Sequence, residues 1–156
     1  MSQKRTKTYR SFSPKETADI GERMAREIRG KGSKRNGAAV LALHGDLGAG
    51  KTTFVGGFFK GLGLKKRAPS PTFVIMRRHK LRGGGFKDVF HVDAYRLKGA
   101  KALLVLGFDE VLDDPRNVVL VEWADRAKGI LPEDALKLHF HHGKKENERT
   151  ITMRKK

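Results

Sequence analysis

A glycine-rich loop followed by lysine and threonine constrains this chain more than any other feature of its sequence. The segment Gly45-Asp46-Leu47-Gly48-Ala49-Gly50-Lys51-Thr52-Thr53 matches the phosphate-binding P-loop pattern G-x-x-x-x-G-K-[ST]. The apolar run 38–44 before it predicts a buried strand, and residues 53–62 after it predict a helix. Strand, loop and helix in this order are the context that the pattern requires, so a chance glycine-rich turn is the weaker interpretation.

The residue types of the loop each have a physical reason. Gly45, Gly48 and Gly50 permit left-handed backbone angles and the close approach of a ligand. Successive amide groups then point toward one anion at the N-terminus of the helix. Lys51 can reach the outer phosphates as a point charge, and Thr52 can offer its hydroxyl to Mg²⁺. The predicted nucleotide contacts in the loop are Asp46, Leu47, Gly48, Ala49, Gly50, Lys51, Thr52 and Thr53.

The charge balance limits the classes of ligand. The chain has 34 lysine and arginine residues against 17 aspartate and glutamate residues, a net charge of +17. Such a field attracts polyanions, including nucleotides and RNA, but the sequence shows no RNA-recognition signature or aromatic stripe. A generally basic, solvated surface and a true RNA contact are therefore equal alternatives.

Cysteine usage and hydropathy exclude several other classes of protein. Cysteine is absent, which rules out a disulfide framework and thiolate metal sites. No apolar run has the length of a membrane span, and the first residues lack the apolar core of a signal peptide. We therefore expect a soluble, cytoplasmic protein that makes no contact with a membrane.

The remaining pattern predicts one α/β domain over residues 12–156, preceded by a basic, flexible arm over residues 1–11. Ser13-Pro14-Lys15-Glu16 form a helix start, with a serine cap, a proline at the first position and a capping-box glutamate, and this helix extends to about residue 29. The strands make a mixed sheet flanked by helices, the architecture of P-loop NTPases. The other predicted elements are strands at 73–80, 87–92, 117–123, 135–141 and 149–153, helices within 99–113 that break at Gly107, and a helical turn at 124–129.

Two acids end buried strands and can serve a nucleotide-bound metal or a water molecule. Asp93 follows the apolar run 89–92, and Glu122 follows the run 118–121. Ligands of open α/β sheets bind at such strand ends, although either acid could instead pair with an arginine. His91 shares a sheet face with Asp93, and we expect it to be packed or hydrogen-bonded rather than an acid–base group.

Two further residues have open interpretations. Thr72, within Ser70-Pro71-Thr72-Phe73, could sense an outer phosphate, but the residues alone favour an ordinary turn. Trp123 directly follows Glu122, and a place beside the nucleotide and packing in the core are equal alternatives. The guanine-reading motif Asn-Lys-x-Asp, a switch Asp-x-x-Gly after a strand and the signature Leu-Ser-Gly-Gly-Gln are missing, so elimination favours an adenine nucleotide.

Four segments, in this order, resemble the TsaE (YjeE) family. They are Gly-Asp-Leu-Gly-Ala-Gly-Lys-Thr-Thr at 45–53, Ser-Pro-Thr-Phe at 70–73, His-Val-Asp-Ala-Tyr-Arg-Leu at 91–97 and Glu-Trp-Ala-Asp at 122–125. The resemblance spans residues 12–154. It implies a small bacterial ATPase that uses ATP and Mg²⁺ and is needed for threonylcarbamoyladenosine (t6A) modification of tRNA. It also implies partners, TsaD and TsaB, which transfer the threonylcarbamoyl group and which the ATPase resets between turnovers.

The resemblance implies roles for individual residues as well. Lys51 and Thr52 would bind phosphates and Mg²⁺, Glu122 would assist the metal, and Asp93 would support hydrolysis. The high charge and the basic N-terminal segment depart from the family pattern and are compatible with a tRNA contact. The remaining implied positions, one in a switch-like loop and one near the nucleotide and the partner surface, are Thr72 and Trp123.

Two other functions are alternatives to a partner-regulated ATPase. A small-molecule kinase would need an acceptor pocket and a lid of arginines, for which Arg77, Arg78 and Arg82 are candidates. A non-enzymatic RNA-binding module would explain the charge without using Lys51. Transfer of labelled phosphate to a metabolite would identify the kinase, whereas salt-sensitive RNA binding that is indifferent to nucleotide would identify the module.

Overall fold

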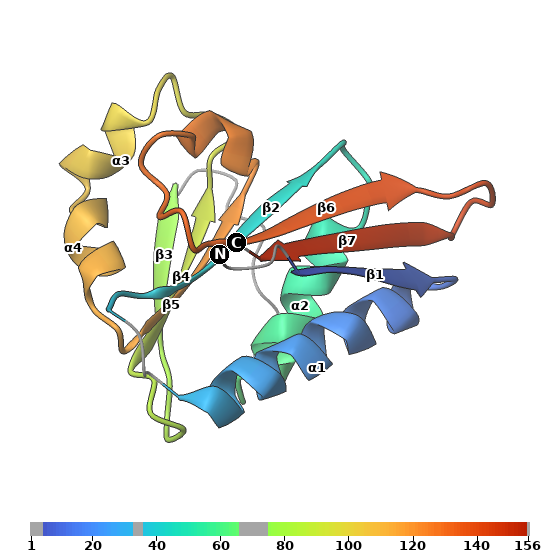
Figure 1. The fold of residues 1–156 in the computed structure, drawn as a ribbon, viewed down its shortest axis with the longest axis horizontal. Helices are drawn as coiled ribbons and strands as arrows, with labels where there is room; N and C mark the ends of the chain where they lie inside the picture. The colour runs from blue at the N-terminus through green and yellow to red at the C-terminus, as the bar shows by residue number, and fades with distance from the viewer. Residues whose placement is uncertain (1–4, 33–35, 66–74, 156) are drawn as a thin grey trace.

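The computed structural model describes residues 5–32, 36–65 and 75–155. In these residues the strands form one seven-stranded mixed sheet in the order β1-β7-β6-β2-β5-β4-β3, with helices on both faces (Figure 1). The predicted mixed α/β fold is therefore confirmed. The strands are β1 (Arg5–Ser11), β2 (Ala39–Gly45), β3 (Met76–Lys80), β4 (Asp88–Asp93), β5 (Asn117–Glu122), β6 (Leu136–His142) and β7 (Arg149–Lys155). The helices are α1 (Pro14–Lys31), α2 (Lys51–Gly61), α3 (Lys101–Val105), α4 (Phe108–Asp113) and the 3-10 turn η1 (Ala124–Ala127).

Different helices cover the two faces of the sheet. α1 and α2 pack on one face, over a core cluster that includes Leu41, Leu43 and Leu120. α3, α4 and η1 pack on the other face, over Val40 and Val121. Because β2 and β5 are buried on both faces, their sequences are continuous apolar runs rather than alternating patterns. Within the described ranges, no helix is both long and apolar enough to cross a membrane.

Helix α1 begins as the sequence predicts. The amide of Glu16 donates to the hydroxyl of Ser13 at 3.1 Å. The Glu16 carboxylate accepts from the amide of Phe12 at 2.7 Å, one residue earlier than in an ordinary capping box. The helix continues past the expected residue 29 to Lys31. Both capping bonds are local, which explains why the sequence alone indicates this start.

The predicted flexible arm is wrong for residues 5–11, which form strand β1. β1 pairs antiparallel with β7 along its whole length, from Arg5 opposite Lys155 to Ser11 opposite Arg149. Of the residues in this strand only Ser11 is buried, so the segment lacks the apolar alternation by which strands are recognised. The exposed edge of β7 supplies the backbone partners, and that edge exists only in the tertiary structure.

The other predicted elements are present, with shifted ends. The hairpin strands expected at 73–80 and 87–92 are β3 and β4, and residues 73 and 74 lie outside the described part of the chain. The predicted break at Gly107 separates α3 from α4, because φ of 78° at this residue is a left-handed angle that other residues rarely adopt. The predicted terminal hairpin is confirmed as β6 paired antiparallel with β7.

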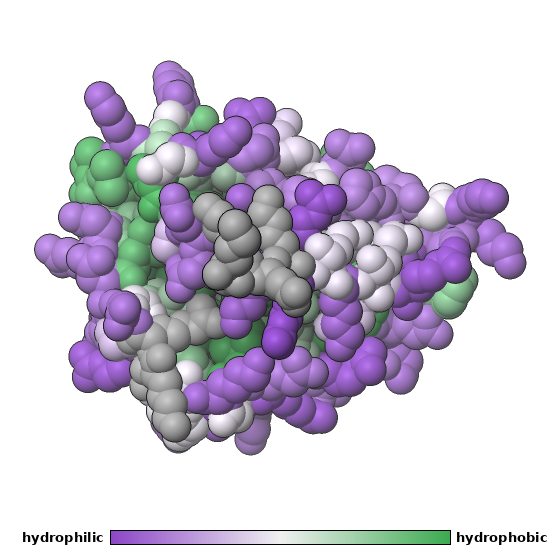
Figure 2. Space-filling model, in the orientation of Figure 1, coloured by the Kyte–Doolittle hydropathy of each residue, from purple (hydrophilic) through white to green (hydrophobic). Residues whose placement is uncertain are grey.

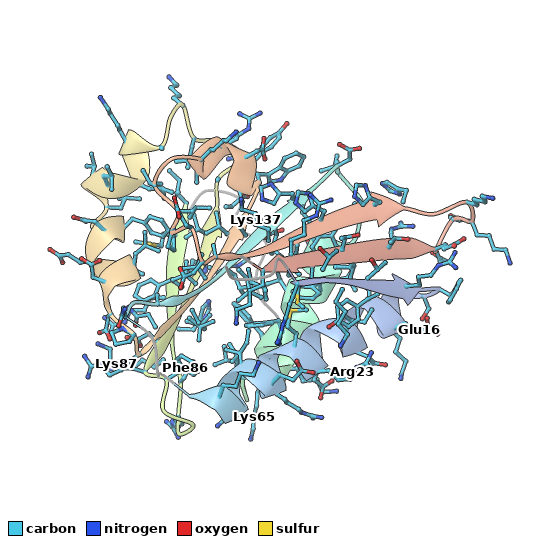
Figure 3. The ribbon with its side chains drawn as sticks, viewed as in Figure 1. Glu16, Arg23, Lys65, Phe86, Lys87 and Lys137 are labelled. Atoms are coloured by element: carbon cyan, nitrogen blue, oxygen red, sulfur yellow. The ribbon has the colours of Figure 1, made fainter. Side chains whose placement is uncertain are left out.

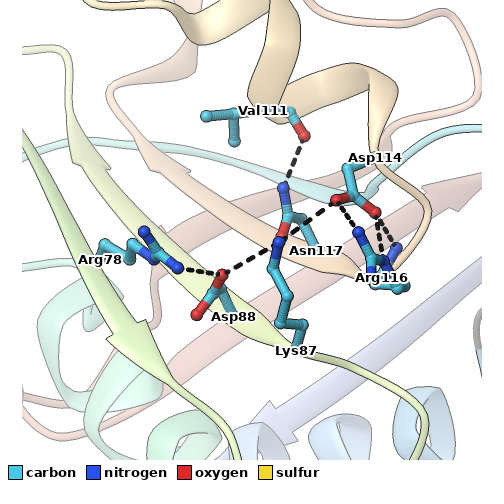
Figure 4. Close-up of polar contacts among 7 residues, drawn as sticks. All are labelled: Arg78, Lys87, Asp88, Val111, Asp114, Arg116 and Asn117. Atoms are coloured by element: carbon cyan, nitrogen blue, oxygen red, sulfur yellow. Dashed lines mark hydrogen bonds and ion pairs between the residues drawn. The ribbon is translucent and has the colours of Figure 1, made fainter.

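A polar network holds the starts of β4 and β5 (Figure 4). Asp88 is buried and pairs with Arg78 at 3.1 Å and with Lys87 at 3.8 Å. Asn117 donates to the carbonyl oxygen of Val111 at 3.0 Å, which ties β5 to the end of α4. Arg78 is thus part of a structural ion pair at the beginning of β4, away from the strand's carboxyl end, and this position does not favour a role in a kinase lid.

Candidate nucleotide-binding site

Three parallel strands end at the same edge of the sheet. β2, β5 and β4 are neighbours, and their register places Leu43 opposite Glu122 and Glu122 opposite Asp93. The chain leaves β2 at Gly45, two residues after Leu43, and enters the glycine-rich loop at this edge of the sheet. The carboxyl edge of an open α/β sheet is where such folds bind ligands. The structure thus brings the loop and both candidate acids together.

The loop backbone adopts the left-handed angles for which glycine is suited. φ is 149° at Gly45, 76° at Gly48 and 100° at Gly50. A Cβ at Gly45 would lie 2.7 Å from the carbonyl oxygen of Phe140, so a larger residue would collide with β6. Helix α2 begins at Lys51, and no side chain caps it. Its first amides therefore lack partners within the helix and are available to an anion.

Lys51 is held against the loop rather than extended into solvent. Its ammonium donates to the carbonyl oxygens of Gly45 and of Asp46, the latter at 3.2 Å, and the residue is only 5% exposed. Its Nζ lies 3.8 Å from the centroid of the Trp123 ring. Burial lowers the pKa of Lys51, and the nearby carboxylates of Glu122 and Asp46 oppose this shift. The partly desolvated ammonium therefore interacts more strongly with a phosphate than a surface lysine would.

Trp123 contacts both the loop lysine and the core, so core packing is confirmed and a place beside the nucleotide stays a prediction. Its ring contacts Lys51, lies 5.0 Å from the Tyr95 ring and packs against the core cluster under α3 and α4. Its φ of 56° makes it the one left-handed residue other than glycine in the part of the chain that the structure describes. Backbone strain of this kind persists where packing over-determines it, often at functional sites.

Glu122 is paired with a histidine. Its Oε2 lies 2.6 Å from Nε2 of His91, and both side chains are buried. The parallel register places His91 and Asp93 on the same sheet face as Glu122. His91 therefore orients the Glu122 carboxylate and is a hydrogen-bonded histidine, as expected. Asp93 accepts from the amide of Tyr95 at 3.0 Å, which holds its carboxylate at the start of the following turn.

The remaining predicted contacts differ in their environments. Thr52 is exposed and Thr53 is half-buried in the first turn of α2. Leu47, in the loop, is 84% exposed. Thr72 lies outside the described residues, so its role in a switch-like loop stays a prediction.

Arg149 contacts the loop, and sequence reasoning missed it. It begins β7, and its Nη2 donates to the carbonyl oxygen of Gly48 at 3.1 Å. Its Nη1 donates to the carbonyl oxygens of Glu146 at 2.6 Å and Glu148 at 2.9 Å. The guanidinium thus ties the β6–β7 turn to the loop. No spacing in the sequence indicates this contact, because Gly48 and Arg149 are 101 positions apart.

The side chains at this edge fit a magnesium ion that is bound together with a phosphate, rather than a metal site built by protein alone. No group of three or more metal-ligating side chains occurs among the residues that the structure describes. Mg²⁺ usually takes one or two carboxylates and completes its coordination with waters and phosphate oxygens. Thr52 and Glu122 would hold it, because the bond to His91 occupies only one of the two Glu122 oxygens.

Comparisons with known proteins identify relatives of both the sequence and the fold. The sequence model of "Threonylcarbamoyl adenosine biosynthesis protein TsaE" matches residues 11–151. The chain is 36% identical over 145 residues to the tRNA threonylcarbamoyladenosine biosynthesis protein TsaE of Bacillus subtilis, which covers 92% of this chain and 84% of that protein. It is 40% identical over 123 residues to the protein of the same name from Streptomyces coelicolor, which covers 78% of this chain and 76% of that protein. The structure is similar to the crystal structure of YdiB from Bacillus subtilis, with a TM-score of 0.74 and 31% identity, over 99% of this chain and 88% of that chain.

Proposed function

The chain belongs to the TsaE family of threonylcarbamoyl adenosine biosynthesis proteins, and we propose that it is the ATPase that regulates a TsaB–TsaD transferase during t6A modification of tRNA. The observation that carries this proposal is the position of Lys51, bonded to the loop carbonyls at the sheet edge where Glu122 and Asp93 end their strands. A buried ammonium, an uncapped helix N-terminus and two acids at one edge are the parts that phosphoanhydride hydrolysis requires.

Each side chain has a defined task in this proposal. The first amides of α2 and Lys51 hold the β- and γ-phosphates and offset the charge that develops on the leaving oxygen. Thr52 and Glu122 hold Mg²⁺, which when bound neutralises phosphate charge. His91 keeps the Glu122 carboxylate oriented through their 2.6 Å contact. Asp93 positions a water, whose oxygen bonds to the γ-phosphorus while the bond to the β-phosphate oxygen breaks, giving ADP and phosphate.

Separate substitutions of the two acids should divide their roles. Glu122→Gln should raise the Mg²⁺ concentration needed for half-maximal hydrolysis, because it removes the charge of a metal ligand. Asp93→Asn should lower kcat by about 10²-fold and leave the Mg²⁺ dependence near that of the wild type. Steady-state hydrolysis measured against MgCl₂ concentration separates the two effects. Asp134→Asn, an exposed change between η1 and β6, is the matched control. A wild-type Mg²⁺ dependence in Glu122→Gln would remove Glu122 from the metal site.

Hydrolysis by the isolated chain should be slow, because Arg149, the arginine that contacts the loop, holds the loop in place instead of facing the phosphates. Arg149 donates to three carbonyl oxygens, so its guanidinium is committed to the loop and the β6–β7 turn. An arginine of the partner would then supply the positive charge that stabilises the transferred phosphoryl group. In other P-loop NTPases an arginine in this role raises kcat by ~10³–10⁵-fold. We expect the TsaB–TsaD pair to raise the rate of hydrolysis at least ~10-fold.

The test is phosphate release from ATP by the purified chain, alone and with purified TsaB and TsaD from the same organism. The Lys51→Ala chain mixed with the same pair is the blank for contaminating ATPases. A rate that the pair leaves unchanged would refute partner regulation. Transfer of the γ-phosphate to a metabolite instead of water would favour a small-molecule kinase.

A further inference from the structure

The sheet face opposite α1 and α2 is only half covered. Among the described residues, the core cluster under α3, α4 and η1 takes members from β2, β4 and β5 but none from β6, β7 or β1. On these three strands the same face carries polar side chains. The register places Lys137 opposite Arg154 and His139 opposite Thr152, and Arg154 is in turn opposite Thr6. On this face β1, β6 and β7 therefore form a polar surface, and His44 at the end of β2 adjoins it through its register partner His139. Figure 3 labels Lys137, which is one of the side chains of this surface.

The connection from η1 to β6 makes this surface into a groove. The groove has a volume of about 960 Å³ and is lined by side chains of β1, β2, β6 and β7 and by residues between 124 and 135. That volume is at the upper end for a small-molecule site. His44, which lies in the groove, directly precedes the first glycine of the loop. The groove thus begins beside the nucleotide edge but lies on the other face of the sheet from α2.

Two histidines form a flat platform in the groove. His44 and His139 are register partners, with ring centroids 4.7 Å apart and ring planes within 10° of parallel. The pKa of His44 is lowered by burial and then by His139, and that of His139 by burial and then by Arg154. Both shifts favour the uncharged form of the rings, which offers a π-face to a base. Unstacked bases of RNA are commonly held on such rings.

The groove that holds this platform is also lined by cations, which are Lys128, Lys137, Arg154 and Lys155. In the described part of the chain, none of them forms an ion pair with a carboxylate. The acids that line the groove are Asp125 and Glu133. The excess positive charge is therefore available to a polyanion.

We propose that this groove binds RNA, with phosphates on Lys137 and Arg154 and an unstacked base on the platform of His44 and His139. Cross-strand neighbours have Cα atoms about 5 Å apart, so the two cations can serve successive phosphates of one strand. The Thr152 hydroxyl beside His139 adds a donor and an acceptor that suit a ribose 2′-hydroxyl. The net charge of +17 supplies long-range attraction. This inference goes beyond the ATPase proposal, because RNA binding in the groove does not depend on hydrolysis.

A hydrophobic surface lies elsewhere on the molecule. Leu104, Val105 and Leu106, in and after α3, are exposed, Val105 by 87%. Figure 2 shows hydrophobic residues gathered over α3, whereas the surface over β6 and β7 is hydrophilic or intermediate. An apolar protein contact suits the α3 surface better than the groove, which favours RNA as the occupant of the groove.

Binding of a fluorescein-labelled, unmodified tRNA transcript tests the proposal. Fluorescence polarisation is measured from ~50 to ~200 mM KCl. The double variant Lys137→Ala/Arg154→Ala should bind at least ~10-fold more weakly, and the slope of log K against log salt should fall in magnitude by about 1.4, since each single-stranded phosphate contact contributes ~0.7. The matched variant Lys98→Ala/Lys101→Ala, with two exposed lysines near α3, should keep the wild-type slope.

Further variants distinguish base stacking on the platform, and binding of a protein partner, from general electrostatic attraction of RNA to the charged surface. His139→Ala should weaken binding about 5- to 100-fold, and His139→Phe, which keeps a flat ring, should restore it. Equal weakening by both double variants, or wild-type affinity of Lys137→Ala/Arg154→Ala, would overturn the proposal. The proposal would also be overturned if Lys137→Ala/Arg154→Ala bound RNA like the wild type but its ATP hydrolysis were no longer stimulated by TsaB–TsaD. That result would make the groove a protein interface. Hydrolysis by the Lys137→Ala/Arg154→Ala chain alone should equal that of the wild type, so a failed ATPase proposal is recognised separately.

Discussion

Lys51→Ala should abolish ATP hydrolysis, with kcat falling by at least ~10²-fold, as when one charge-stabilising donor is removed from an active site. The ammonium is held by the carbonyl oxygens of Gly45 and Asp46 and is nearly buried, so no solvent cation takes its place easily. Nucleotide affinity should fall as well. Trp123 reports on it, because it is the only tryptophan and its ring lies 3.8 Å from the Lys51 ammonium. Phosphate release and tryptophan fluorescence are the two measurements.

Lys60→Ala is the matched control on the same helix. Lys60 is exposed and pairs with Glu22 at 3.8 Å, and a surface pair of this kind contributes only ~0–1 kcal/mol. Its hydrolysis and its nucleotide titration should match those of the wild type. A Lys51→Ala protein that melts like the wild type and still retains more than ~10% of its rate would show that the loop lysine is not part of the hydrolytic site.

Gly57→Ala should produce the largest loss of stability of any single methyl addition in α2. A Cβ at Gly57 would overlap the carbonyl oxygen of Ala18, because α1 and α2 cross with their backbones in contact. Gly61 and Gly21 make the same kind of close approach along this seam. Backbone cannot move aside as a flexible side chain can, so we expect a loss of ~2–3 kcal/mol in the free energy of unfolding. In urea this corresponds to a midpoint lower by ~1 M.

Gly56, the residue before Gly57, provides a control in which the opposite change in stability is expected. A Cβ at Gly56 meets no atom within 4 Å, and Gly56 lies within α2. Gly56→Ala should therefore stabilise the protein by ~0.5–1 kcal/mol, because alanine loses less conformational freedom in a helix. Urea midpoints that move in the same direction for both variants would contradict the close packing of α1 on α2.

The loop and the strand-end acids could be predicted because the information for them is local. The residues from Gly45 to Thr53 are consecutive, and a lysine and a threonine at the required places after the glycines are readable without any partner. Asp93 and Glu122 each follow an apolar run that must be a buried strand, so their position at strand ends follows from the sequence. The start of α1 at Ser13 depends on hydrogen bonds between residues no more than four positions apart, so it could also be predicted from the sequence.

Strand β1, the contact of Arg149 with the loop and the pairing of His91 with Glu122 were decided only by the tertiary structure. β1 exists because β7 offers an unpaired edge, and its own side chains are mostly exposed. Arg149 reaches Gly48 across 101 positions of the chain, and His91 meets Glu122 because β4 lies parallel to β5. The sequence by itself therefore determined the fold class, the loop and the acids beside it. The order of strands in the sheet determined that Arg149 holds the loop, that His91 orients Glu122 and that one half of a sheet face stays uncovered. The reason is that these groups are distant in the sequence and only the assembled sheet brings them together.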